Sequence, residues 1–265
     1  MNTSKNYCLA LAYDGSAYQG WQDHPERDVA TIQAAVNLGV SLFLGGDKTK
    51  VYAAGRTDKG VHATAQVIHF NTNVVRKLNS FIPGINHYLP TDIRIITANQ
   101  VDEKFHARFK ACKRTYHYII TSSTYPGWRH YAYVLSDLPD IELMNQACEL
   151  ILGEHDFSTW RSAGCGSSNA IRYIYQAKWS IKGDFIVFSI TANGYLYNMV
   201  RNLIGLLLKI GYGKFPPTYM ITCLQGGARS YSPYRAPSQG LYLSGIEYPS
   251  EYKYLSILKI PSMIS

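Results

Sequence analysis

The order of strand-like and helix-like segments in the first hundred residues constrains the fold of this 265-residue chain more than any other feature. The segments are an apolar strand-like run at 6–13, helical apolar spacing at 31–44, short strand-like runs near Tyr52 and Ile68, a helical piece at 75–80 ending before Pro83, and a β-rich run at 92–101. Strand, helix, two strands, helix, strand is the order of a ferredoxin-like or RRM-like unit.

The rest of the chain repeats this order without repeating the sequence. Its segments are a strand at 113–121, a helix at 141–152, a hairpin formed by 173–181 and 185–192, a long helix at 195–210 and a closing strand at 241–247. We therefore predict an α+β fold with two ferredoxin-like or RRM-like halves, whose mainly antiparallel sheets are joined around a central basic cleft. The expected domains are 1–105 and 106–265.

The positive charge of the chain is concentrated in long acid-poor stretches. The formal net charge is +8, yet Asp184 is the only acid between Phe157 and Ile246, where there are nine Lys and Arg. Residues 104–136 hold no acid, six Lys and Arg, three His and eight aromatic residues. Positive charge concentrated in this way produces an electric field that attracts polyanions. The interleaved aromatic side chains favour RNA over a lipid surface. Most of the 22 tyrosines are still expected to be core or half-buried strand residues.

The five cysteines are widely spaced and form no Cys-x-x-Cys pair, so we expect reduced thiols and a cytoplasmic protein, without a disulfide framework or a zinc site. The first residues do not read as a signal peptide. The most hydrophobic run, 203–210, is too short to cross a bilayer, so no membrane association is expected.

The strand-like runs near Tyr52 and Ile68 are connected by residues 55–63, with the sequence GRTDKGVHA. Asp58 stands between Arg56 and Lys59 on a turn bounded by two glycines. Neighbouring cations favour the ionised carboxylate, and an ionised carboxylate suits a nucleophile better than a general acid. A hairpin turn whose charges are solvated would give the same pattern. His62 follows four residues after Asp58, and a structural histidine accounts for it better than a catalytic pair.

The long helix at 195–210 has a broad apolar stripe and a second stripe that carries Arg201 and Gly205. The glycine would allow a neighbouring segment to approach closely, and the arginine could reach a carboxylate on a facing element. The alternative is an arginine whose stem packs while its charged end reaches water.

The motif at 55–63 resembles the active-site motif of the tRNA pseudouridine synthase A (TruA-type) family. Two further blocks similar to the family's precede this motif and five follow it, all in the family's order: 13–22 (YDGSAYQGWQ), 31–33 (TIQ), 105–109 (FHARF), 113–118 (KRTYHY), 153–157 (GEHDF), 198–202 (NMVRN) and 236–243 (APSQGLYL). Lys59 stands where bacterial members more often carry alanine, and we expect it to point outward.

The resemblance implies a role for each of five residues. Asp58 would be the nucleophile, Arg201 its ion-pair partner, and Tyr116 a ring that stacks on the uracil. Arg56 would help to hold the flipped-out uridine, and Leu243 would form an apolar wall of the pocket.

The resemblance also implies an isomerase that converts uridine to pseudouridine at positions 38, 39 and 40 in the anticodon arm of tRNA and works as a homodimer. The reaction adds and removes no atoms, so we expect no cofactor and no metal. The chain also lacks a Gly-x-Gly-x-x-Gly loop, a Walker loop and a His-Glu-x-x-His motif.

Two other functions are weighed against this one. A non-catalytic RNA-binding protein with two RRM-like units would also be basic, although the usual RRM aromatic motif is absent. A hydrolase would pair Asp58 with a second carboxylate, but acids are scarce in the carboxyl-terminal half.

Overall fold

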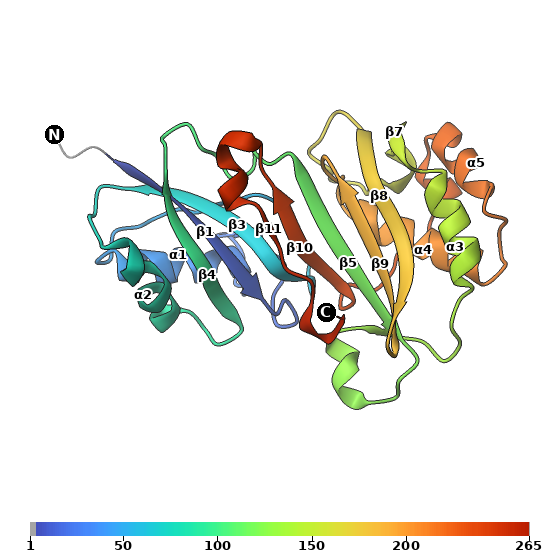
Figure 1. Cartoon of the computed structure of the whole chain (residues 1–265), viewed down its shortest axis with the longest axis horizontal. Coiled ribbons are helices and arrows are strands. Elements are labelled where there is room, and N and C mark those ends of the chain that lie inside the picture. Colours follow the sequence, from blue (N-terminus) through green and yellow to red (C-terminus); the bar gives the residue numbers. More distant parts are fainter. Residues whose placement is uncertain (1–3, 265) are drawn as a thin grey trace. The chain divides into compact units, whose positions relative to one another are not determined.

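The computed structural model describes residues 4–264, which fold into two compact units (Figure 1). Among the described residues, the first unit contains 4–114 together with Tyr242–Pro261, and the second contains Thr115–Leu241 and 262–264. Each unit combines helices with a mostly antiparallel sheet, as an α+β fold requires.

The sheet of the first unit has the strand order β4-β1-β3-β10. Its strands are β1 (Lys5–Tyr13), β3 (His62–Thr72), β4 (Ile93–Val101) and β10 (Leu241–Glu247), with the two-residue strands β2 (Tyr52–Ala53) on β3 and β11 (Ile257–Leu258) on β10. β1 runs antiparallel to both neighbours, whereas β10 runs parallel to β3, with Leu243 opposite Ala63. The predicted strands at 6–13, 92–101 and 241–247 are thus confirmed within one or two residues at each end.

The first unit's helices are α1 (Ile32–Phe43) and α2 (Phe81–Tyr88), which pack against each other. Thr31 caps α1 by accepting the N–H of Ala34. The predicted helical piece at 75–80 is confirmed only at Leu78–Ser80, as a 3-10 turn, and its predicted end before Pro83 was wrong, because α2 contains Pro83 within its first turn. Backbone N–H groups of a first turn have no partner inside the helix, so proline is tolerated there.

The sheet of the second unit has the strand order β5-β9-β8-β7, with β6 beside β5. Its strands are β5 (Lys113–Thr121), β6 (Tyr133–Val134), β7 (Gly153–Asp156), β8 (Ile171–Lys182) and β9 (Phe185–Ala192), and its helices are α3 (Ile141–Glu149), α4 (Met199–Gly211) and α5 (Tyr219–Gly226). Short 3-10 turns in the two units cover Leu78–Ser80, Pro126–His130, Ser158–Trp160, Arg229–Tyr231, Ser250–Leu255 and Ser262–Ile264.

The long helix begins later than the sequence pattern predicts. α4 starts at Met199 because Asn198 has a left-handed backbone with φ of 60°, which a helix cannot include. The predicted hairpin is confirmed: β8 and β9 pair from Ile174–Ala192 to Lys182–Phe185.

Large buried side chains fill the interior of each unit separately. Tyr7, Phe70 and Phe81 form an aromatic cluster in the first unit, and the rings of Trp179 and Phe188 stack at 4.8 Å in the second. Within residues 4–264 no helix combines the length and the apolar character that crossing a membrane requires.

Candidate active site

Asp58 lies on the connection between β2 and β3 in the first unit. The carbonyl of Asp58 accepts the N–H of Val61 at 3.1 Å, which closes a tight turn, and Gly60 supplies a positive φ of 73°. Asp58 is half-buried, whereas Arg56 and Lys59 are exposed. The turn therefore holds the carboxylate at the surface of the unit, and Lys59 lies on its solvent side, as expected.

A second loop, residues 14–22, packs against this turn. Its backbone makes two hydrogen bonds to it: the N–H of Trp21 donates to the carbonyl of Thr57 at 2.9 Å, and the N–H of Gly60 donates to the carbonyl of Tyr18 at 3.3 Å. The two loops approach so closely at Gly20 that a Cβ there would lie 2.7 Å from the Thr57 carbonyl oxygen. These particular contacts to the backbone around Asp58 involve no side chain of the turn.

Thr57 anchors the turn through its side chain. It is buried, and its hydroxyl shares a 2.8 Å hydrogen bond with the Tyr13 hydroxyl at the end of β1. Burial raises the pKa of Tyr13, which keeps the phenol protonated and able to donate. Thr57, the residue before Asp58, is therefore hydrogen-bonded to the end of β1, an inner strand of the sheet.

His62 has a structural role, as the sequence indicated. Its ring is 2 % exposed and stacks on Tyr242 at 4.7 Å. Its Nδ1 accepts the N–H of Gly15 at 3.1 Å and lies 3.2 Å from Oδ1 of Asp14. The histidine therefore fastens the loop at 14–22 to the start of β3.

The amino-terminal side of the turn is also braced. The buried amide of Gln66 accepts the N–H of Gly55 at 3.3 Å and donates to its carbonyl at 2.7 Å. Arg114 donates to the carbonyls of Ala54 and Arg108, at 3.1 and 2.7 Å from Nη2. These bonds fix the backbone leading into Arg56 and Asp58.

Arg56 and Leu243 lie on the same unit as Asp58. Partial burial, and to a smaller extent the charge of Arg108, lowers the pKa of Arg56 from its ordinary value. Leu243 is fully buried in β10, and its Cδ2 would lie 3.8 Å from a Cβ built at Gly55. The structure thus brings Leu243 next to the turn that carries Arg56 and Asp58.

Arg201 and Tyr116 belong to the second unit. Arg201 lies in the first turn of α4, where its Nε donates to the carbonyl of Ala236 at 2.9 Å and its own carbonyl accepts the Ala236 N–H at 2.9 Å. The expected close approach at Gly205 is confirmed, because a Cβ there would lie 2.8 Å from the backbone of Tyr234 and Arg235. The segment 234–237 is therefore seated on the face of α4 that carries Arg201.

Tyr116 lies on β5 and is 8 % exposed. Its ring meets the ring of Tyr195 edge to face, with centroids 5.2 Å apart and an interplanar angle of 87°. Two residues on, the Tyr118 hydroxyl donates to the carbonyl of Pro237 at 3.0 Å. Burial raises the pKa of Tyr118 well above its ordinary value, while the charge of Arg201 acts in the opposite direction.

Sequence reasoning missed the residues that hold the turn: Tyr13, Trp21, Thr57, Gln66 and Arg114. A signal was present for four of them, since Tyr13 and Trp21 fall in the block at 13–22, Thr57 in the motif at 55–63 and Arg114 in the block at 113–118. No local pattern distinguishes Gln66 from an ordinary strand residue.

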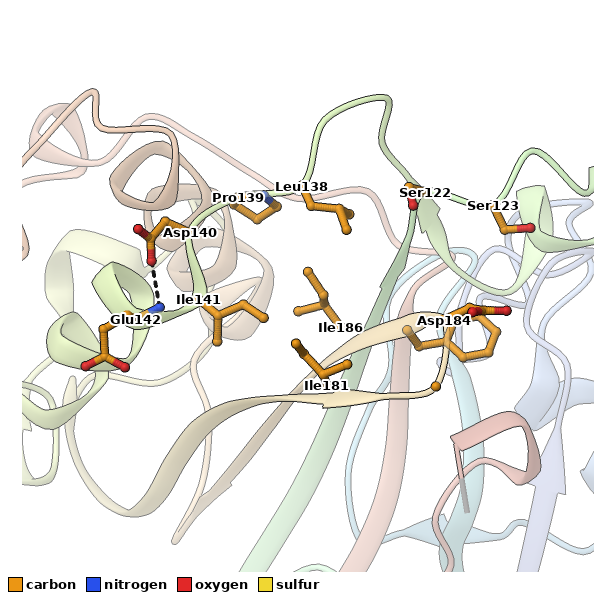
Figure 2. A pocket seen from close by; sticks show the side chains of 12 residues that line it. Ser122, Ser123, Leu138, Pro139, Asp140, Ile141, Glu142, Ile181, Asp184 and Ile186 are labelled. Carbon is orange, nitrogen blue, oxygen red and sulfur yellow. Dashed lines mark hydrogen bonds between the residues drawn. The ribbon is translucent and has the colours of Figure 1, made fainter.

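The second unit also contains a hollow of about 740 Å³, lined by residues of α3, β8 and β9 and the loops beside them (Figure 2). Ile141, Ile181 and Ile186 form its apolar part, while Glu142 and Asp184 contribute carboxylates. None of the five predicted site residues lines it. Its carboxylates would repel phosphate groups, so it does not suit an RNA backbone.

Throughout the described range, 4–264, no three His, Cys, Asp or Glu side chains gather as ligands of a metal ion would.

A family model described as tRNA pseudouridine synthase matches residues 9–110 and 147–249. A tRNA pseudouridine synthase A of Bordetella petrii is 41% identical over 248 residues, covering 92% of this chain and 92% of its own. Proteins of the same name from Nitrosomonas eutropha and Francisella tularensis subsp. holarctica are each 40% identical over 92% of this chain, covering 88% and 95% of their own lengths. The chain belongs to the tRNA pseudouridine synthase family.

Four of the predicted site residues lie within the two stretches that match the pseudouridine synthase model: Arg56, Asp58, Arg201 and Leu243. Tyr116 lies between those stretches. The turn that carries Asp58 and the helix that carries Arg201 are thus parts of the chain shared with the family.

Proposed function

We propose that this protein is a tRNA pseudouridine synthase that isomerises uridines 38, 39 and 40 in the anticodon arm of tRNA, acting in the cytoplasm as a homodimer. The observation that carries this proposal is the turn at Asp58, which lies in a stretch matched by the family model and is braced by backbone bonds from the loop at 14–22. A rigid support of this kind is what a carboxylate needs if it must meet one atom of a large substrate.

The reaction breaks the bond between ribose C1′ and uracil N1, turns the base, and forms a bond between C1′ and C5. The proton on C5 is released to solvent and N1 gains a proton, so atoms balance without a co-reactant. Asp58 would be the nucleophile that holds the intermediate, and Arg201 would keep its carboxylate ionised by ion pairing.

A uridine inside a helical arm must leave the base stack before it can react, which costs a few kcal/mol. We assign Arg56 to stabilising the flipped-out state, since it is exposed two residues before Asp58. Tyr116 would stack on the uracil, and Leu243 would form the apolar wall beside the turn. Each unit would act as a ferredoxin-like half, and basic side chains would hold the arm.

Action at three adjacent positions implies recognition of shape and backbone charge more than of base edges. RNA helices are generally recognised in this way, and phosphate contacts fix register without reading sequence. The acid-poor stretches at 104–136 and 157–246 supply cations for such contacts.

The deciding experiment measures tritium release from C5-labelled uridine in an unmodified tRNA transcript, comparing the wild-type protein with Asp58→Asn. We expect release by the wild type and none by the variant, with unchanged tRNA affinity in a filter-binding assay. Equal release by both proteins would place the chemistry elsewhere. Tight binding without release by the wild type would instead indicate a non-catalytic RNA-binding protein.

A further inference from the structure

Two arginines of the acid-poor stretch at 157–246 converge on one side-chain amide in the second unit. Arg229 Nη2 and Arg235 Nε donate to Oδ1 of Asn202, at 3.1 and 3.2 Å. Asn202 is fully buried in the first turn of α4, directly after Arg201. Because both groups bond to a single oxygen, the two guanidinium groups lie side by side.

This arginine pair has no counter-ion in the part of the chain that the structure describes. Neither Arg229 nor Arg235 forms an ion pair with a described carboxylate. Asn202 accepts a hydrogen bond from each but carries no net charge. Burial, and then the neighbouring charge of Arg235, lowers the pKa of Arg229 from its ordinary value. Arg229 Nη1 is moreover buried without a hydrogen-bond partner among residues 4–264.

Arg235 is also bonded to the residues that follow Trp160, a part of the second unit that contains two more arginines, Arg161 and Arg172. Arg235 Nη2 donates to Oγ of Ser162 at 3.0 Å. Ser167 lies on the loop that follows Ser162. Its carbonyl accepts a hydrogen bond from Arg161 at 3.5 Å, and its hydroxyl accepts one from Arg172 at 3.1 Å. Arg235 is therefore bonded to Ser162, five residues before the serine that accepts hydrogen bonds from Arg161 and Arg172.

We propose that the pair Arg229–Arg235 binds a phosphodiester group of the tRNA backbone, an inference that rests on the function proposed above. Guanidinium groups match phosphate oxygens in a two-pronged geometry, and a phosphate supplies the negative charge that the pair lacks. Arg235 is exposed and would make the direct contact, while the half-buried Arg229 adds its charge behind it. Such a contact positions the RNA without reading its sequence.

The position of the pair links backbone binding to the candidate active site. Arg235 precedes Ala236, whose carbonyl accepts the Nε bond of Arg201. A phosphate held by Arg235 would thus sit beside the segment that orients Arg201. The competing explanation is that the two arginines only fasten residues 229–237 to α4.

The test compares Arg235→Gln with the wild type in tRNA affinity at 50 to 200 mM salt and in KM and kcat on an unmodified transcript. The control is Arg27→Gln, which removes an exposed arginine already 3.9 Å from the carboxylate of Glu26. We expect the slope of log K against log salt to become shallower by about one in Arg235→Gln. Its KM should rise at unchanged kcat, and Arg235→Lys should restore the slope because it keeps the charge.

A slope and KM equal to those of the wild type would overturn the proposal. A fall in kcat or melting temperature at unchanged salt slope would also overturn it, because that result indicates a purely structural role. The proposed function fails separately, through absence of tritium release by the wild type, since the salt slope reports binding whether or not turnover occurs.

Discussion

Gly20 lies directly against the backbone of Thr57, the residue before the candidate nucleophile. Gly20 has a φ of +99°, and a Cβ there would lie 2.7 Å from the Thr57 carbonyl oxygen and 3.0 Å from the carbonyl carbon of Asp58. The sequence block at 13–22 thus acts on the site through its backbone. Only glycine satisfies both the conformation and the spacing.

Gly20→Ala is therefore expected to displace the turn at Asp58 and to reduce kcat for tritium release at least tenfold. It should also lower the free energy of unfolding by about 1–3 kcal/mol, the usual cost of a strained backbone. Gly45→Ala is the matched control, since Gly45 has a φ of +101° but no atom within 4 Å of the added Cβ. If both variants keep wild-type kcat, the contact at Gly20 is not needed to position the turn at Asp58.

The hydroxyl pair of Tyr13 and Thr57 should be measurable as a coupling energy. Thr57→Val leaves the buried Tyr13 hydroxyl without this partner, and we expect a loss of about 1–3 kcal/mol in stability. Tyr13→Phe should cost a similar amount, and the double variant less than the sum of the two. Urea unfolding of the four proteins gives the coupling, and additive losses would show that the 2.8 Å contact contributes nothing.

The sequence predicts local elements of this fold well where one pattern acts alone. The strands at 113–121 and 185–192 and the tight contact at Gly205 follow from alternation and from a glycine on a helix face, and all are confirmed. The predicted end of the helical piece at 75–80 was wrong, because proline usually ends a helix but is accepted in a first helical turn, where Pro83 lies.

Long-range relationships have no comparable local signal. Nothing near Leu243 indicates that β10 pairs in parallel with β3 in the first unit, since this pairing joins segments about 180 residues apart in sequence. Similarly, Asp58 and Arg56 stand out in the sequence, whereas Gln66, which holds Gly55 from both sides, looks like any polar strand residue. Support residues act through the backbone of others, so their side chains carry no chemical signature of the site.

Buried histidines should make the fold less stable as the pH falls below neutrality. Burial and the neighbouring His106 lower the pKa of His69 to about 4. In the unfolded chain the pKa is about 6.5, so between pH 6.5 and 4 the unfolded state binds a proton that the folded state does not. The contribution of His69 to the free energy of unfolding is therefore fully present above pH 6.5. It decreases as the pH drops toward 4, by about 2 kcal/mol between pH 7 and pH 5.

His69→Gln should remove this part of the pH dependence. The glutamine amide can still accept the N–H of Ala107, which His69 Nδ1 accepts at 3.2 Å. Urea unfolding at pH 7, 6 and 5 measures the effect, with exposed His87→Gln as the control. The same pH dependence in His69→Gln and the wild type would contradict the assignment.

The ring of Tyr116 should matter for turnover and its hydroxyl should not. Tyr116→Phe keeps the ring and its contact with Tyr195, so we expect nearly normal tRNA affinity and tritium release. Tyr116→Ala should lose turnover by roughly 5- to 150-fold, since base stacking is worth about 1–3 kcal/mol. Melting temperatures separate this loss from unfolding caused by the cavity. Wild-type turnover in a folded Tyr116→Ala protein would remove the stacking role.

Gly205→Ala tests whether the segment 234–237 orients Arg201. In an open helix position, Gly→Ala raises stability by about 1 kcal/mol, because alanine is the better helix former. At Gly205 the added Cβ would lie 2.8 Å from the backbone of Tyr234 and Arg235, so the segment must move. We expect the opposite sign, a loss of about 1–3 kcal/mol. The displaced Ala236 carbonyl would also release the Nε of Arg201, and kcat should fall more than KM changes. A stabilised protein with normal kcat would show that the segment 234–237 can move without affecting the active site, and that Arg201 is oriented by its other contacts.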